Sequence, residues 1–228
     1  MAAGVIFLAV LGGILPALIW LVFWLFEDRC QPEPKRYIFL CFLAGALTVP
    51  LVLPIERYFM GILSGPLLLF VWAVTEELFK FAAAYIAALR TRTFDEPLDA
   101  VVYLVTAALG FSALENVLFL LTPLGDGDFL RGLVMGDLRF IGATLLHTLA
   151  SATVGLSIAY SWGKPAAVRR VAAAGGLILA IALHTLFNFF ILGSGGNTMF
   201  WVFLCIWVGI AATLFLTERV KQPARDYC

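Results

Sequence analysis

The chain has 228 residues, of which 62% are hydrophobic and 13% are charged, and its mean hydropathy is +0.99. A water-soluble domain has about 25% charged residues and could not bury this much apolar surface, so the composition excludes a soluble globular protein. The formal net charge of zero gives no sign of an electrostatic surface for nucleic acid, and we expect the lipid bilayer, not a nucleic acid, as a partner.

Seven apolar segments are long enough to cross about 30 Å of hydrocarbon as helices. They are too long and too uniformly apolar for barrel strands, which would alternate. We therefore predict an all-α, polytopic membrane helix bundle that forms one domain over residues 1–228. The predicted helices cover residues 4–26, 37–54, 62–89, 98–121, 140–161, 171–192 and 198–217.

Lysine and arginine are distributed unevenly over the connectors between these helices. Most of them lie in the first, third and fifth connectors and in the C-terminal tail, whereas the other side of the membrane receives Arg57, Arg131 and Arg139. Basic residues favour the cytoplasmic side of short loops. We predict an N-terminus outside and a C-terminus in the cytoplasm, with connector 122–137 as the longest outer loop and a candidate gate.

The stretch TEELFKF, residues 75–81, places Glu76, Glu77 and Lys80 inside the third predicted span. An ionisable side chain within a bilayer is costly and marks a functional site by default. The structural alternative is an ion pair between Glu76 and Lys80, which lie four residues apart, but this pair leaves Glu77 without a partner.

Three further spans carry polar side chains at a similar depth. If each faced lipid separately, the cost would be large, so we expect them to surround one wet cavity with the third span. The polar positions of these spans are Glu115, Asn116, His147, His184 and Asn188, and Arg139 lies at the predicted outer end of the fifth span. Structural alternatives exist for several of them: an interhelical hydrogen bond for Glu115 and Asn116, a core histidine bonded to Ser151 or to a carbonyl for His147, and snorkelling for Arg139.

Carboxylates and imidazoles in one cavity suit three kinds of chemistry. They can activate water for hydrolysis, hold a metal ion for hydrolysis, or pass protons or cations across the membrane. The predicted cytoplasmic half is poor in polar groups and no inverted repeat is visible, which weighs against transport. The sequence contains no HExxH motif, so a zincin-type site is excluded.

These residues also resemble a known family. The stretch EELFK at 76–80 resembles the EExxK motif of the PrsW intramembrane proteases, and GFSALEN at 110–116, His147 with Gly155, and HTLFNF at 184–189 resemble its other motifs in the same order. The family is similar to the CAAX-protease and bacteriocin-processing superfamily, whose pattern is EExxxR, FxxxH and HxxxN. Here Phe111 to Glu115 reads FxxxE, whereas His184 to Asn188 fits HxxxN.

The resemblance implies a peptidase of the bacterial inner membrane that makes the first, extracytoplasmic cut in a single-pass substrate such as an anti-sigma factor. On this hypothesis Glu76 is the general base, helped by Glu115 or His147, and Glu77 orients it or shares its proton. His184 and Asn188 then bind the developing oxyanion.

The remaining polar residues are expected to support this chemistry. Lys80 balances charge, and Asn116 and Arg139 assist. We expect a metal-free reaction without a cofactor, and the alternative is a zinc ion on Glu76, Glu115, His147 and His184. The rival function is a membrane transporter, or a scaffold that uses the same cavity to bind a partner.

Overall fold

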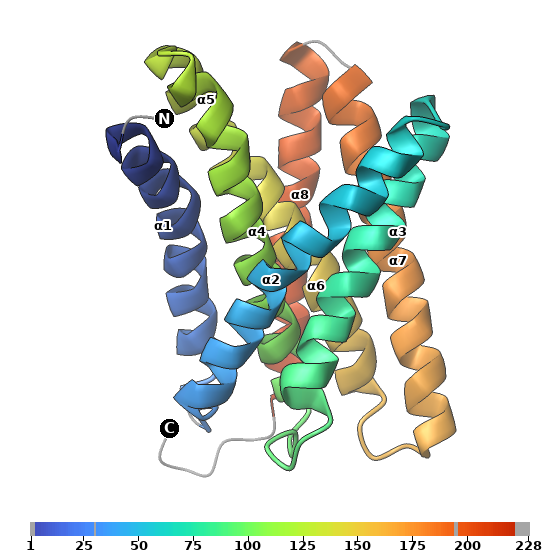
Figure 1. Cartoon of the computed structure of the whole chain (residues 1–228). Helices are drawn as coiled ribbons and strands as arrows, with labels where there is room; N and C mark the ends of the chain where they lie inside the picture. Colours follow the sequence, from blue (N-terminus) through green and yellow to red (C-terminus); the bar gives the residue numbers. More distant parts are fainter. Residues whose placement is uncertain (1–2, 30, 194–195, 222–228) are drawn as a thin grey trace.

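The structure, a computed structural model, describes residues 3–29, 31–193 and 196–221. Every regular element in these residues is helical, as Figure 1 shows. The elements are α1 (Ala3–Glu27), α2 (Lys35–Met60), α3 (Gly65–Ala84), η1 (Tyr85–Leu89), α4 (Asp99–Gly125), α5 (Phe129–Leu138), η2 (Arg139–Ala143), α6 (Thr144–Tyr160), α7 (Ala166–Gly193) and α8 (Gly196–Val220), where η marks a π-helical turn.

Helix α3 continues directly into η1, and α5, η2 and α6 form one uninterrupted stretch. The described residues therefore make seven continuous helical stretches, which confirms the predicted all-α, polytopic bundle. Five helices, α1, α2, α4, α7 and α8, are long and apolar enough to cross a membrane by length and composition alone. The start of α1 and the end of α8 lie at opposite ends of the bundle, as an odd number of crossings requires (Figure 1).

Two predicted connectors are wrong because proline does not end these helices. Helix α2 contains Pro50 and Pro54 and runs on to Met60, and α4 continues past Pro123. Proline is tolerated within membrane helices because neighbouring helices and local adjustments satisfy the freed backbone groups. The predicted outer loop 122–137 is consequently mostly helix, with a short turn between α4 and α5.

Helix α5 begins at a side-chain cap. The Asp128 carboxylate accepts a hydrogen bond from the backbone N–H of Arg131 at 3.0 Å, which satisfies one of the free N–H groups of the first turn. The stretch then runs through η2 into α6 without a break. The α4–α6 connection is thus mostly helix rather than an open loop.

Helix α4 is the centre of the bundle, and nearly all of its residues from Asp99 to Ala113 are buried. Small residues allow α2 to approach it closely, as is common between membrane helices. A Cβ atom on Gly45 would lie 1.9 Å from the carbonyl oxygen of Ala107, and one on Gly110 would lie 1.9 Å from that of Phe42. These two contacts fix the crossing of α2 and α4.

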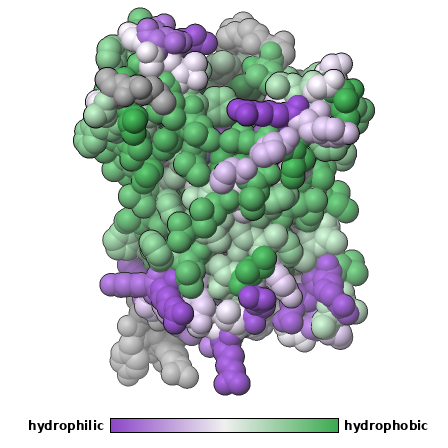
Figure 2. All heavy atoms as spheres, in the orientation of Figure 1, coloured by the Kyte–Doolittle hydropathy of each residue, from purple (hydrophilic) through white to green (hydrophobic). Residues whose placement is uncertain are grey.

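The outer surface is an apolar belt between two more hydrophilic ends (Figure 2). Large apolar side chains on it are exposed, including Phe7 on α1, Leu51 on α2 and Val171 on α7. Such a band would be unstable in water, and it matches the hydrocarbon of a bilayer. The structure therefore confirms a multi-pass membrane protein.

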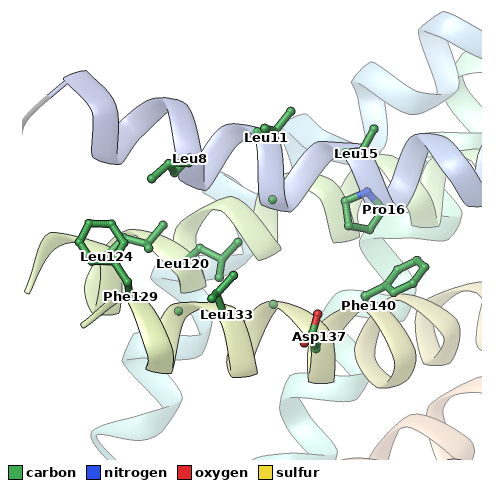
Figure 3. Close-up of a pocket in the computed structure, with 13 residues that line it drawn as sticks. Leu8, Leu11, Leu15, Pro16, Leu120, Leu124, Phe129, Leu133, Asp137 and Phe140 are labelled. Carbon is green, nitrogen blue, oxygen red and sulfur yellow. The ribbon is translucent and has the colours of Figure 1, made fainter. Parts of the chain in front are cut away.

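An apolar groove of about 460 Å³ lies between α1, α4 and the α5–η2 stretch. Leu8, Leu11 and Leu15 of α1 face Leu120 and Leu133 across it, as Figure 3 shows. Asp137 is the one charged residue of its lining, and none of the buried histidines or glutamates of the spans reaches it. The groove is therefore separate from the polar centre described next.

Candidate active site

Four helices bring their polar side chains together in the interior of the bundle. Helix α3 supplies Glu76, Glu77 and Lys80, α4 supplies Glu115, α6 supplies His147 and α7 supplies His184. All of them except Glu115 are at most 5% exposed. The shared cavity that the sequence predicted is thus a compact, almost closed polar centre.

Glu77 is the anchor of this centre. Its Oε1 accepts a hydrogen bond from Lys80 Nζ at 2.6 Å and another from His184 Nδ1 at 2.7 Å. The sequence-based alternative of a Glu76–Lys80 pair is wrong, because the lysine reaches back three residues instead of four and meets the carboxylate that faces α7. In the neutral ring that donates through Nδ1, the Nε2 of His184 is free to act as an acceptor or ligand.

His147 lies between a cation and an anion. Its Nδ1 accepts from Lys80 Nζ at 2.8 Å, so its proton is on Nε2, which donates to Glu115 Oε2 at 3.2 Å. The alternative partners considered for this ring, Ser151 or a backbone carbonyl, are not used. Both ring nitrogens of His147 are therefore bound by charged neighbours, which sets the tautomer and the orientation of the ring.

Glu115 is held in place by Arg139. The two side chains form an ion pair, and Arg139 Nε also donates to Asn116 Oδ1. Asn116 in turn donates from Nδ2 to Thr144 Oγ1 at 3.0 Å, and the guanidinium group lies 3.9 Å from the ring centre of Phe119. Arg139 thus points into the centre rather than snorkelling, and Glu115 is occupied as an orienting group for His147.

Glu76 is the exception among these carboxylates, because its Oε2 is buried and has no hydrogen-bond partner among the described residues. This oxygen lies 3.9 Å from His147 Nδ1 and 3.9 Å from His184 Nε2. A buried carboxylate oxygen without a partner is costly, so it marks the place where a water molecule or a cation fits.

The same atoms satisfy the donor requirements of a metal ion. One atom each of Glu76, His147 and His184 lie within 4.8 Å of one another, and two histidines with one carboxylate are a known ligand set for zinc. The bond of Glu77 to the far nitrogen of His184 is the support that metal-binding histidines require. A metal bound through His147 Nδ1 would replace the hydrogen bond from Lys80, and Glu115, which the sequence placed in this set, is held by Arg139 instead.

Two residues differ from what the sequence indicated. Asn188 lies one turn beyond His184 and is half-buried, and its side chain makes no hydrogen bond to another described residue. Glu56 of α2, which the sequence placed in a connector, lies with its carboxyl group beside that of Glu76. Its position continues the buried face of Val49 and Val52, so extending the helix past Pro54 would have revealed it.

A family model described as PrsW family intramembrane metalloprotease matches residues 33–213. The chain belongs to the PrsW family. It is 28% identical to Protease PrsW of Oceanobacillus iheyensis over 82% of this chain and 84% of the relative, and 25% identical to that of Halalkalibacterium halodurans over 77% and 79%. The Geobacillus kaustophilus enzyme is 32% identical over 48% of this chain, and the matched segment spans half the length of that relative. No solved structure matches the chain.

Membership of the PrsW family confirms the resemblance that the sequence motifs indicated and makes the chain a membrane peptidase. The family match runs through all four helices that build the polar centre. The chemistry of a peptidase requires a base that activates water and groups that stabilise negative charge, and this centre supplies both kinds of group within an apolar bundle.

Proposed function

We propose that the chain cleaves a peptide bond of a single-pass membrane protein, and that water is activated at Glu76 between His147 and His184. The observation that carries this proposal is the buried oxygen of Glu76, which has no partner among the described residues and lies 3.9 Å from a nitrogen of each histidine. A water molecule at this position would contact a base and two imidazoles at once. Such a placement is what general base catalysis needs.

In this mechanism Glu76 takes a proton from the attacking water and later gives it to the amine that leaves. Lys80, fully buried beside Glu77, supplies positive charge close to the developing oxyanion. Glu77 fixes the ring of His184 so that its Nε2 faces the reaction, and Asn188 is placed one turn further along α7 to bind the substrate carbonyl. Glu115 and Arg139 orient His147.

A zinc ion is the alternative form of the same proposal, and the specific observation in its favour is the ligand set of Glu76, His147 and His184. When bound, zinc would supply Lewis acidity and lower the pKa of a coordinated water. In this form Glu77 keeps its bond to the far nitrogen of His184. Lys80 would then pair with Glu77 alone.

Chelation separates the two forms. Purified protein in detergent is incubated with a chelator, dialysed, and mixed with a single-pass reporter substrate. Unchanged cleavage supports the metal-free reaction. Loss of cleavage that zinc restores in the wild type establishes the metal-dependent one.

The reaction itself is tested with Glu76→Gln, which keeps the shape of the side chain and removes the base. We expect cleavage to fall by about 10³-fold, within the range for general base catalysis. Asp137→Asn is the matched control, because it also neutralises one carboxylate but lies in the apolar groove. If Glu76→Gln cleaves the reporter normally, or if proton flux and not cleavage depends on Glu76, the proposal fails in favour of a scaffold or a transporter.

For the substrate we propose a membrane-bound anti-sigma factor, cut first on the extracytoplasmic side of the bacterial inner membrane. The support is the resemblance to the PrsW motifs and the partial exposure of Glu115 and Arg139, at 18% and 15%, on the side of the centre nearest the predicted outer end. Co-expression of the chain with single-pass anti-sigma factors, followed by mapping of the new N-terminus of the fragment, tests both points. Fragments cut on the cytoplasmic side would contradict the proposal.

A further inference from the structure

A second buried polar cluster lies at the opposite end of α4, where the α1–α2 and α3–α4 connections meet. It is formed by four carboxyl groups and one phenol, each at most 9% exposed. Its members are Asp28, Glu33, Glu96, Asp99 and Tyr103. At about 1.5 Å per residue along α4, Asp99 lies about 24 Å from Glu115, so this cluster is distinct from the candidate active site.

The four carboxyl groups are close neighbours of one another. Glu96 lies beside both Asp28 and Asp99, and Glu33 lies beside Asp99. The hydroxyl group of Tyr103 donates a hydrogen bond to the carboxyl group of Glu33. The cluster therefore joins two connections that are far apart in the sequence.

Two aspartates in the cluster each use only one of their oxygens. Asp28 Oδ2 accepts from the backbone N–H of Glu33 at 3.2 Å, and Asp99 Oδ2 accepts from the N–H groups of Asp95 and Glu96 at 2.8 and 2.9 Å. The Oδ1 atoms of both aspartates are buried and have no partner among the described residues. These aspartates are 2% and 0% exposed, so water from bulk solvent does not reach them freely.

No lysine or arginine in the described part of the chain forms an ion pair with this cluster. None of the lysine or arginine nitrogens there lies within 4.0 Å of its four carboxyl groups, and the nearby Lys221 pairs with Glu27 and Glu218 instead. Burial first, and then the neighbouring Asp99, raises the pKa of both Glu33 and Glu96 above the usual range. Carboxylates packed in this way are stabilised either by protonation or by an added positive charge.

We propose that this cluster binds a hard divalent cation, of the Mg²⁺ or Ca²⁺ kind, between the α1–α2 and α3–α4 connections. Carboxylate oxygens are the ligands that both ions prefer. The unpartnered oxygens of Asp28 and Asp99 supply two ligands, and Glu96, which contacts both aspartates, supplies a third. Binding ties the end of α1 to the start of α4 and holds the central helix at its inner end.

The test is a thermal unfolding series on the full chain in detergent, after dialysis against a chelator. Mg²⁺, Ca²⁺ or Na⁺ is added at matched ionic strength. We expect Mg²⁺ or Ca²⁺ to raise Tm by about 5 °C or more at saturating concentration, with the ion of higher affinity identified by the midpoint of the titration. The Glu76→Gln variant should show the same rise, since its substitution lies at the other centre.

Glu96→Gln removes a ligand of the cluster, and we expect it to abolish the Tm rise. Asp99→Asn should act in the same way, but it also weakens two backbone hydrogen bonds that the Asp99 carboxylate accepts, so Glu96→Gln is the deciding variant. Asp95→Asn is the matched control, an exposed acid of the same connection. The proposal is overturned if divalent ions do not raise Tm, if Glu96→Gln retains the full rise, or if Asp95→Asn loses as much as Glu96→Gln.

Discussion

The two buried clusters on α4 solve the same electrostatic problem in opposite ways. At one end, Glu77 and Glu115 are each paired with a cation of the chain, Lys80 and Arg139. At the other end, four carboxyl groups touch one another without such a partner. A countercharge supplied by a side chain is always present, whereas a countercharge supplied by a bound ion depends on the ion concentration in solution.

This difference assigns different properties to the two ends. The candidate active site contains its own countercharges, which are built into helices α3 and η2, so its one unpartnered carboxylate oxygen is available for chemistry. The carboxyl cluster has no chemistry of its own to offer beyond ligation. We expect it to respond to ions and to leave the peptidase reaction itself unchanged.

The largest effect on the difference between the two clusters is expected when Lys80, the internal cation of the candidate active site, is removed. Lys80→Met leaves Glu77 buried without its ammonium partner, and we expect a loss of about 3–5 kcal/mol in the free energy of unfolding. Denaturant unfolding in detergent measures it. The double variant Lys80→Met with Glu77→Gln should recover much of the loss, and a single variant as stable as the double would contradict the pairing.

The helix that separates the clusters can be displaced without touching either of them. Gly110→Ala would place a Cβ 1.9 Å from the carbonyl oxygen of Phe42, and we expect it to cost about 1–3 kcal/mol of stability through a shift of α2 against α4. Gly175→Ala is the control, because nothing lies within 4 Å of its Cβ position. Equal unfolding midpoints for the two variants would show that the α2–α4 contact is not tight.

A milder change tests whether Glu115 orients His147. In Glu115→Gln the amide can still reach both Arg139 and His147, but its charge is gone, and we expect peptide cleavage to fall about 10–100-fold, as for other supporting partners of histidines. Single-turnover cleavage of the reporter measures this. A loss as complete as that of Glu76→Gln would instead make Glu115 the base. The Tm rise with divalent ions should persist.

The smallest expected effect belongs to the second cluster. Tyr103→Phe removes the hydroxyl group that donates to Glu33, and the net value of such a hydrogen bond is about 1 kcal/mol. We expect a slightly lower unfolding midpoint and unchanged cleavage. Strong loss of cleavage in a stable Tyr103→Phe protein would show that the two clusters are coupled through α4.

The sequence predicted the seven helical stretches because their apolar length is set by the bilayer and is visible in one dimension. It also predicted that Glu77, Glu115, His147 and His184 would meet, because each would be costly in lipid alone. It missed the course of α2 and α5, since proline and glycine carry less weight in a membrane than in water.

The sequence could not predict which charged side chains pair with one another. Whether Lys80 meets Glu76 or Glu77 depends on the side from which α7 packs, and that is a tertiary property. The cluster around Asp99 was also missed, because Asp28 and Glu33 come from a connection that reads as an ordinary polar loop.

The π-helical turn η2 allows Arg139 and His147 to contact the same side chain, Glu115. In an uninterrupted α-helix these two positions would point about 80° apart. In η2 the N–H of Thr144 reaches the carbonyl oxygen of Arg139, five residues back, and the extra residue in this turn reduces the difference to about 20°. A one-residue deletion between Arg139 and Ala143 should therefore yield a regular helix that still presents both side chains to Glu115.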